Sequence, residues 1–137
     1  MLLLRNQAYT SMVAHCLDEF PLEACGLLVG RTDIDGDDRV EECRAATNVA
    51  ASARVYTVEP RDLLRADRDA EAAGMALLGV YHSHTHTDAY PSPTDVASAP
   101  DPGWHYILVS LRDSEPAVRS YRIEDGKIRE EPVVLQW

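Results

Sequence analysis

The sequence predicts an α/β fold in which two main helices flank a mixed sheet of about six strands. Three observations predict this class: two segments with helical features, several short apolar runs bounded by glycine or polar turns, and a length of 137 residues. Apolar residues make up 45% of the chain, which is enough to build a hydrophobic core. We therefore expect a single domain that spans residues 1–137.

The first third of the chain predicts one helix and two strands. Residues 6–20 carry apolar side chains at the i, i+3, i+4 spacing of an amphipathic helix. Asn6 can cap the start of this helix, and Pro21 ends it. Residues 25–31 (CGLLVGR) are short, apolar and bounded by glycines, which predicts a buried strand. After a polar turn, residues 39–45 are expected to return as its partner.

The rest of the chain predicts a second helix among further strands. Residues 54–58 are β-branched and aromatic, which indicates a short strand. Pro60 suits the first position of a helix, which Gly74 ends. Residues 75–84 are almost continuously apolar, as expected for a central strand that is buried on both faces. Three closing strands are expected over residues 104–111, 117–123 and 127–135, with a turn at 124–126 between the last two.

The charge balance and the cysteines exclude several function classes. The chain has 13 Lys and Arg against 23 Asp and Glu, which gives a net charge of −10. An acidic surface repels nucleic acids and anionic membranes, so we expect neither as a partner. The three cysteines form no CxxC pair, and the longest apolar stretch, residues 75–81, is too short to cross a bilayer. These features predict a cytoplasmic protein without a disulfide framework.

Two histidines at alternate positions form the clearest candidate site. His82 and His84 end the strand predicted over residues 75–84, and alternate residues of a strand point to one face. Converging imidazoles are typical zinc ligands, and Asp95 could supply an oxygen ligand. Each feature also has an ordinary interpretation, because strand histidines are often simply packed and residues 92–95 (SPTD) make a good helix start. A helix cap and a metal ligand are compatible roles for Asp95, since the cap would hold its carboxylate rigidly.

The spacing of these residues resembles the JAMM motif of the MPN (Mov34/PAD-1) metalloproteases, H-x-H followed by seven residues and S-x-x-D. This chain has HSH at 82–84, seven residues, and SPTD at 92–95. The family also carries a glutamate upstream of an apolar strand, and here Glu23 precedes residues 25–30 (CGLLVG). The resemblance covers nearly the whole chain and implies a single MPN domain with a curved mixed sheet.

Within this family, the string HSHT…AYPS…D is similar to the bacterial Mec+-type (CysO-cysteine) peptidases, as are residues 119–126. Thr85 departs from the family pattern, since many members have proline after the second histidine. Mec+-type peptidases act on ubiquitin-like, β-grasp sulfur-carrier proteins that end in Gly-Gly. The resemblance therefore implies hydrolysis after Gly-Gly, with release of cysteine or a short extension, in cysteine biosynthesis or sulfur delivery.

The resemblance also implies roles for individual residues. One Zn²⁺ per chain would be held by His82, His84 and Asp95, with a water in its open position. Glu23 would act as the general base, and the Ser92 hydroxyl would stabilise the oxyanion. Without the motif, Glu23 would be read as an ordinary solvated acid.

The loop after the histidine strand supplies further candidates for substrate contacts, namely Thr85, His86 and Tyr90. His86 extends the histidine alternation, but the chain must leave the strand there, so we expect a solvated loop residue rather than a metal ligand. Tyr90 could pack on an extended substrate tail or simply anchor the loop, and the sequence does not decide between these roles.

Other functions of the same family stay open. An isopeptidase that removes ubiquitin-like modifiers from lysines would use the same chemistry. A non-catalytic MPN scaffold would lack motif residues, whereas all five are present here. The acidic charge and the absence of an H-N-H-P-S-G form argue against a RadC-like domain, and the missing PCxxC half excludes a zinc deaminase. The sequence leaves a homodimer open.

Overall fold

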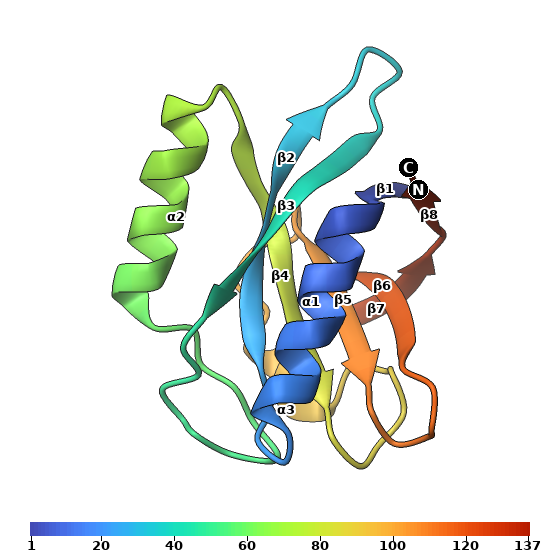
Figure 1. Ribbon diagram of the computed structural model, residues 1–137. Helices are drawn as coiled ribbons and strands as arrows, with labels where there is room; N and C mark the ends of the chain where they lie inside the picture. Colours follow the sequence, from blue (N-terminus) through green and yellow to red (C-terminus); the bar gives the residue numbers. More distant parts are fainter.

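The computed structural model describes all residues from 1 to 137 and contains one eight-stranded mixed sheet with three helices (Figure 1). The strand order is β7-β6-β5-β4-β2-β3-β1-β8. In chain order the elements are β1 (Leu2–Arg5), α1 (Asn6–Glu19), β2 (Cys25–Thr32), β3 (Asp38–Ala46), α2 (Pro60–Ala72), β4 (Ala76–His84), α3 (Pro93–Ala97), β5 (His105–Ser110), β6 (Ala117–Glu124), β7 (Lys127–Glu131) and β8 (Val133–Gln136). The predicted α/β class is confirmed, with eight strands instead of about six.

The two additional strands lie at the ends of the chain. β1 is a four-residue apolar run that pairs in parallel with both β3 and β8. Such a short run has no periodicity of its own, so only these long-range pairings reveal it. The single strand expected over residues 127–135 is divided at Pro132, which has no N–H to donate to a ladder. The Pro132 carbonyl instead accepts a hydrogen bond from the Leu2 N–H.

The strand predicted over residues 54–58 is wrong. This segment makes only one isolated bridge, between Asn48 and Val58. The Asn48 side chain takes the hydrogen bonds that a ladder would otherwise make: its amide donates to the Val55 carbonyl, and its oxygen accepts from the Thr57 N–H. The segment is therefore an ordered loop that is held by side chains rather than by a neighbouring strand.

The predicted helices are present, but the start of the first one differs from the expectation. α1 follows β1 directly, and its N-cap is Arg5, which makes no capping hydrogen bond, so the predicted Asn6 cap is wrong. α2 starts at Pro60 as expected, and the Glu59 side chain caps it. No helix of the structure has both the length and the apolar character needed to span a membrane.

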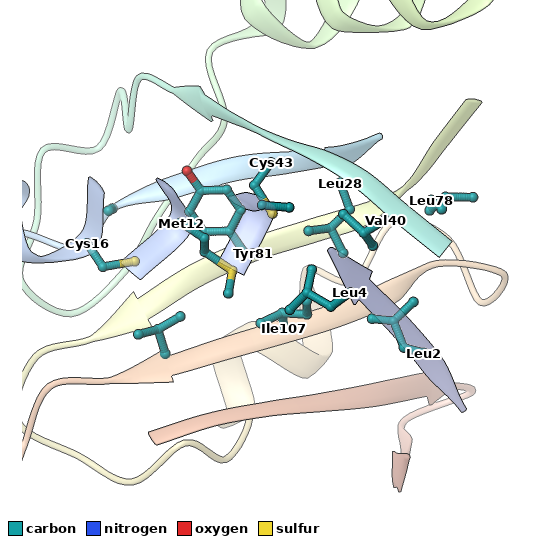
Figure 2. Close-up of a cluster of buried hydrophobic side chains, with 13 residues drawn as sticks. Leu2, Leu4, Met12, Cys16, Leu28, Val40, Cys43, Leu78, Tyr81 and Ile107 are labelled. Carbon is teal, nitrogen blue, oxygen red and sulfur yellow. The ribbon is translucent and has the colours of Figure 1, made fainter. Parts of the chain in front are cut away.

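α1 crosses one face of the sheet and buries the larger part of the core (Figures 1 and 2). Figure 2 shows Met12 and Cys16 of α1 close to Tyr81 of β4. Gly26 of β2 lies opposite Tyr81, and a Cβ atom on it would approach the Tyr81 ring to 2.2 Å. The glycine therefore allows the aromatic ring to pack across the two strands. All three cysteines are free and buried.

The opposite face of the central strands is also buried. Val80 of β4 and the alternate residues Tyr106 and Leu108 of β5 form a second core cluster on that face. Tyr56 and Val58 of the 47–58 loop pack against this cluster. The central strands are thus covered on both faces, as their continuous apolar character predicts.

β7 and β8 form the two opposite edges of the sheet, yet they follow one another in the chain. A cluster of polar side chains links several strands near the junction between them. The buried His105 places its Nδ1 atom 2.6 Å from Glu131 Oε2 and its Nε2 atom 2.7 Å from Asp38 Oδ2. Ser120 also donates a hydrogen bond to Glu131. These four residues, which we call the closure cluster, link β5, β7, β3 and β6.

Candidate active site and metal centre

Three predicted metal ligands converge at the end of β4. His82 and His84 are both buried, and alternation along the strand directs them to the same face. The Asp95 Oδ2 atom lies 3.2 Å from His82 Nε2 and 3.0 Å from His84 Nε2. The ligand atoms of all three residues lie within 4.8 Å of one another. The structure therefore brings together two imidazoles and a carboxylate that could share one metal ion.

The start of α3 fixes the position of Asp95 through a capping box. The Ser92 Oγ atom accepts a hydrogen bond from the Asp95 N–H at 3.1 Å. In return, the Ser92 N–H donates to Asp95 Oδ2 at 2.9 Å. Pro93 occupies the first helical position, where its missing N–H costs nothing. The cap and the candidate ligand are therefore the same residues, as the sequence allowed.

Contacts behind the two imidazoles orient them. His84 Nδ1 donates to the Asp88 carbonyl at 2.8 Å, which leaves Nε2 to face Asp95. The His82 ring stacks on Tyr56, with ring centroids 4.1 Å apart and planes inclined by 22°. Tyr56 was not singled out by the sequence, because nothing in a local pattern connects it with a histidine 26 positions later. Partners of this kind hold metal-binding imidazoles in the required orientation.

The unsatisfied polar atoms at this position fit a divalent cation. His82 Nε2 is buried without a hydrogen bond, although Asp95 Oδ2 lies 3.2 Å away, and Glu23 Oε1 is also buried without a partner. Buried polar atoms normally have hydrogen-bond partners, so orphaned atoms in a cluster need an explanation. Two neutral imidazoles and a carboxylate are a familiar ligand set for a catalytic metal with an open coordination position.

Burial and the contacts among the three candidate ligands shift their pKa values in different directions. Burial alone would raise the pKa of Asp95, but the close approach of the His82 and His84 imidazoles to its carboxylate outweighs this and holds the pKa well below its usual range. Burial lowers the pKa of His82 despite its contact with Asp95. Burial also acts to lower the pKa of His84, but there the hydrogen bonds to Asp95 and to the Asp88 carbonyl prevail and raise it. Asp95 is therefore available as an anionic ligand at neutral pH.

Glu23 lies directly before β2, next to the histidine strand. Cys25 pairs with His82, and the Ala24 N–H donates to Ser83 Oγ at 2.8 Å, so the antiparallel register places Glu23 opposite His84. The Glu23 side chain is only 3% exposed. Burial raises the pKa of Glu23 to about 7, and the charge of Asp95 acts in the same direction. This carboxyl group can therefore exchange a proton near neutral pH.

An open cleft of about 620 Å³ lies beside this group. Its lining comprises Glu23, Ala53, Arg54, His84, Thr85, His86, Thr87 and Ser92. Two of the loop candidates, Thr85 and His86, therefore contribute to the cleft. The Thr85 hydroxyl donates to the Ala53 carbonyl at 3.2 Å and lies 2.8 Å from His86 Nδ1. Thr85 thus ties the end of the histidine strand to the 47–58 loop.

The third loop candidate, Tyr90, lies elsewhere. It is 55% exposed and packs edge-on against Tyr121 of β6, with ring centroids 5.6 Å apart. Tyr90 lines a different cavity, together with Asp88 and Tyr121. The geometry corresponds to the anchoring role that the sequence left open, since Tyr90 does not line the cleft beside Glu23.

The sequence matches the family described as prokaryotic homologs of the JAB domain over residues 5–124. It is 43% identical over 134 residues to a CysO-cysteine peptidase of Mycobacterium tuberculosis, with 97% of this chain and 90% of that protein covered. It is 39% identical over 115 residues to a probable TtuB-protein conjugate cleaving protease of Thermus thermophilus, with 83% and 70% covered.

A solved structure has the same fold. The solution structure of protein DSY2949 from Desulfitobacterium hafniense superposes with a TM-score of 0.91 at 36% sequence identity. The match covers 99% of this chain and 93% of that one. The arrangement of strands and helices that positions the site is therefore shared over nearly the full length.

Proposed function

The chain belongs to the prokaryotic JAB-domain family, and we propose that it is a zinc-dependent peptidase acting on the C-terminal tail of a ubiquitin-like sulfur-carrier protein. The observation that carries this proposal is the convergence of His82, His84 and Asp95 beside the buried carboxyl group of Glu23. The 43% identity to a CysO-cysteine peptidase supports the substrate class. We propose that the carrier ends in Gly-Gly and that cysteine, or a short extension, is removed.

The residues of the cleft suit peptide hydrolysis. His82, His84 and Asp95 would hold the zinc ion, which when bound supplies Lewis acidity and makes water a competent nucleophile at neutral pH. Glu23 would accept the proton of the attacking water on its carboxylate and return it to the leaving amine. Ser92 uses its oxygen to accept from the Asp95 N–H, which leaves its hydroxyl hydrogen free to stabilise a developing oxyanion.

The proposal is tested with a purified carrier that ends in Gly-Gly-Cys. Intact-mass spectrometry should show the loss of one cysteine in the presence of the zinc-loaded protein, and a chelator should stop this reaction. Loss that persists in the metal-free protein would contradict the metal mechanism. An unchanged carrier mass with zinc-loaded protein would contradict the substrate assignment.

The metal ligands predict a separate result. His84→Ala and Asp95→Ala should each lose the zinc that the wild type retains at one ion per chain, because two remaining ligands bind poorly. His86→Ala is the matched control, since His86 is an exposed histidine of the adjoining loop. Metal analysis after gel filtration measures both. Equal zinc content in His84→Ala and the wild type would exclude His84 as a ligand.

A second candidate function is isopeptide cleavage, which removes a ubiquitin-like modifier from a lysine. It is favoured by the 39% identity to a probable TtuB-protein conjugate cleaving protease. A lysine-linked conjugate offered beside the Gly-Gly-Cys carrier distinguishes the two activities. Faster cleavage of the conjugate would favour the isopeptidase. All three cysteines are free, which is compatible with the reducing cytoplasm that we propose as the site of action.

A further inference from the structure

We propose that Arg54 recognises the free α-carboxylate of the residue that is released, and so selects C-terminal peptides over internal or lysine-linked bonds. This inference rests on the proposed function and names the feature of the substrate that the cleft selects. Arg54 is the only arginine in the cleft lining, which contains no lysine. It shares that lining with Glu23, His84 and Ser92, the residues closest to the proposed chemistry.

The Arg54 guanidinium lacks a partner within the protein. Some arginines of this acidic chain are paired, such as Arg5 with Glu41 at 3.0 Å and Arg44 with Asp69 at 2.6 Å, and several on the surface are not. Among the unpaired arginines, only Arg54 lines the cleft. Arg54 makes no ion pair and no side-chain hydrogen bond, although the net charge is −10. An arginine that stays free among excess carboxylates, and at the edge of a cleft, is available for an anionic ligand.

The backbone that carries Arg54 is nevertheless well anchored. The Arg54 N–H donates to Ser52 Oγ at 3.0 Å, and the Ser52 carbonyl accepts from the Glu23 N–H at 2.8 Å. The Ala53 carbonyl accepts from the Thr85 hydroxyl. Glu23 and Thr85, the residue that follows the histidine strand, are thus both bonded to the loop that carries Arg54. The arginine keeps a defined position relative to Glu23 while its side chain remains free to reach a ligand.

The chemistry of the proposed reaction supplies the ligand. When the bond after Gly-Gly is cut in a Gly-Gly-Cys tail, the leaving residue carries an α-carboxylate two bonds from the scissile nitrogen. Glu23 and Asp95 would repel this anion in the absence of a cation. A guanidinium binds a carboxylate through two parallel hydrogen bonds, which offsets the repulsion and orients the tail. A lysine side chain linked through its amine places no carboxylate at this position.

The test uses two carriers that differ only at the terminus, one ending in Gly-Gly-Cys with a free carboxylate and one ending in Gly-Gly-cysteinamide. We expect the wild type to prefer the acid in kcat/KM. Arg54→Gln should lower kcat/KM for the acid by roughly 10- to 100-fold, the range of a charge-assisted hydrogen bond, and leave the amide unchanged. Comparing the acid-to-amide ratio between enzymes cancels the intrinsic difference in reactivity of the two substrates. Arg54→Lys should retain part of the preference.

Arg68→Gln is the control, because Arg68 is an exposed arginine of α2 outside the cleft and the substitution changes the net charge equally. Its acid-to-amide ratio should equal that of the wild type. An equal loss on both substrates in Arg54→Gln, or no loss on the acid, would overturn the assignment of Arg54 while the proposed function stands. A zinc-loaded wild type that cleaves neither carrier would overturn the proposed function and this inference with it.

Discussion

The carboxyl group of Glu23 is buried, lacks a hydrogen-bond partner on Oε1 and has its pKa raised by burial and by the charge of Asp95. A protein that needed only stability would not retain such a group, because an unpaired buried carboxyl is costly. Its usefulness lies in proton transfer, for which a pKa near neutrality is best suited.

Glu23→Gln is therefore expected to keep the metal and lose hydrolysis. The amide has nearly the same shape, but it cannot accept a proton, so kcat should fall by about 10²–10⁴-fold. Zinc content and turnover of the Gly-Gly-Cys carrier are measured on the same preparation. Because Glu23 must be ionised to act, the wild-type kcat/KM should decrease as the pH falls below about 7. A bound cation would lower this pKa and move the decrease to lower pH. Near-normal turnover in Glu23→Gln would contradict the assignment.

Ser92 caps α3, and we propose in addition that its hydroxyl stabilises the oxyanion; measurements of stability and of turnover distinguish the two roles. Ser92→Ala removes the cap of α3 and should cost about 1 kcal/mol of stability. If the hydroxyl also stabilises the oxyanion, the same change should lower kcat by about 10²–10³-fold with zinc retained. Ser92→Thr keeps both the cap and the hydroxyl and serves as the control. A loss of stability without a loss of kcat would leave Ser92 with the cap alone.

The candidate ligands could be predicted from the sequence because they lie in a fixed spacing that carries its own chemistry, whereas Glu23 could be proposed as the general base only through the family resemblance. Tyr56, Asn48 and Arg54 could not. Each acts on the site through a loop whose contacts are decided by distant residues, as when Asn48 donates to the Glu23 carbonyl at 3.0 Å. No spacing in the sequence encodes such a contact.

At the scale of elements, the junction between β2 and β4 decides where Glu23 lies relative to His84. The middle residue of the His-Ser-His sequence makes this junction, since Ser83 Oγ accepts from the Ala24 N–H and the Ser83 N–H donates to the Ala24 carbonyl. The alternation of a strand predicts that Ser83 points away from the histidines. What it contacts there depends on the pairing of the two strands.

Ser83→Ala is expected to weaken this junction. The substitution leaves the Ala24 N–H buried and without an acceptor, which costs about 1–3 kcal/mol in the free energy of unfolding. Ser11→Ala is the matched control, because Ser11 is exposed on α1 and should change stability by less than about 0.5 kcal/mol. Urea denaturation measures both. Because Glu23 adjoins Ala24, kcat should also fall in Ser83→Ala. Equal stabilities of the two variants would show that the junction does not depend on this hydroxyl.

The helices and turns that were predicted correctly are those whose signal lies within a short stretch of sequence, either as hydrophobic periodicity or as residues that favour a turn. Both main helices and the turn at Asp125 and Gly126, which have φ angles of 51° and 75°, are of this kind. The failures have a common cause. β1 exists because two distant strands pair with it, and residues 54–58 are a loop because Asn48 takes their hydrogen bonds. For β1 the partners are distant strands, and for residues 54–58 the partner is a side chain seven to nine positions away; in both cases a contact that no local pattern reveals overrides propensity.

At the scale of the whole molecule, the sheet curls so that β7 passes directly into β8, and the two chain termini lie side by side (Figure 1). The closure cluster lies at this point. The His105 ring lies between the carboxylates of Asp38 and Glu131, with one ring nitrogen within hydrogen-bond distance of each, and the amino group of Met1 lies 3.9 Å from Glu131. The histidine was not singled out in the sequence, because its partners are 67 and 26 positions away.

Replacing His105 should destabilise the whole domain rather than the site. His105→Ala leaves the buried Glu131 carboxylate without this hydrogen-bond partner, and depriving a buried polar group of its partner costs about 1–3 kcal/mol, more for a charged group. The control is Arg119→Ala, which removes an exposed ion pair with Glu130 on the neighbouring strands and should cost at most about 1 kcal/mol. The free energy of unfolding at pH 7, from urea denaturation, distinguishes them. Similar decreases in the free energy of unfolding of both variants would contradict the proposal that His105 stabilises the domain through the closure cluster.

The closure cluster also predicts how stability responds to acid. Burial alone would raise the pKa values of Asp38 and Glu131, but hydrogen bonds from Thr32 and His105 to Asp38, and from His105 and Ser120 to Glu131, lower both. A carboxyl group whose pKa is lowered by folding stabilises the fold above its unfolded pKa of about 4 and loses this contribution as the pH falls further. Wild-type stability should therefore decline steeply below pH 4. His105→Ala lacks one of the interactions that lower both pKa values, so its stability should decline less over the same range. Equal slopes in the two proteins, measured by urea denaturation between pH 5 and pH 3, would assign the acid sensitivity to other carboxylates.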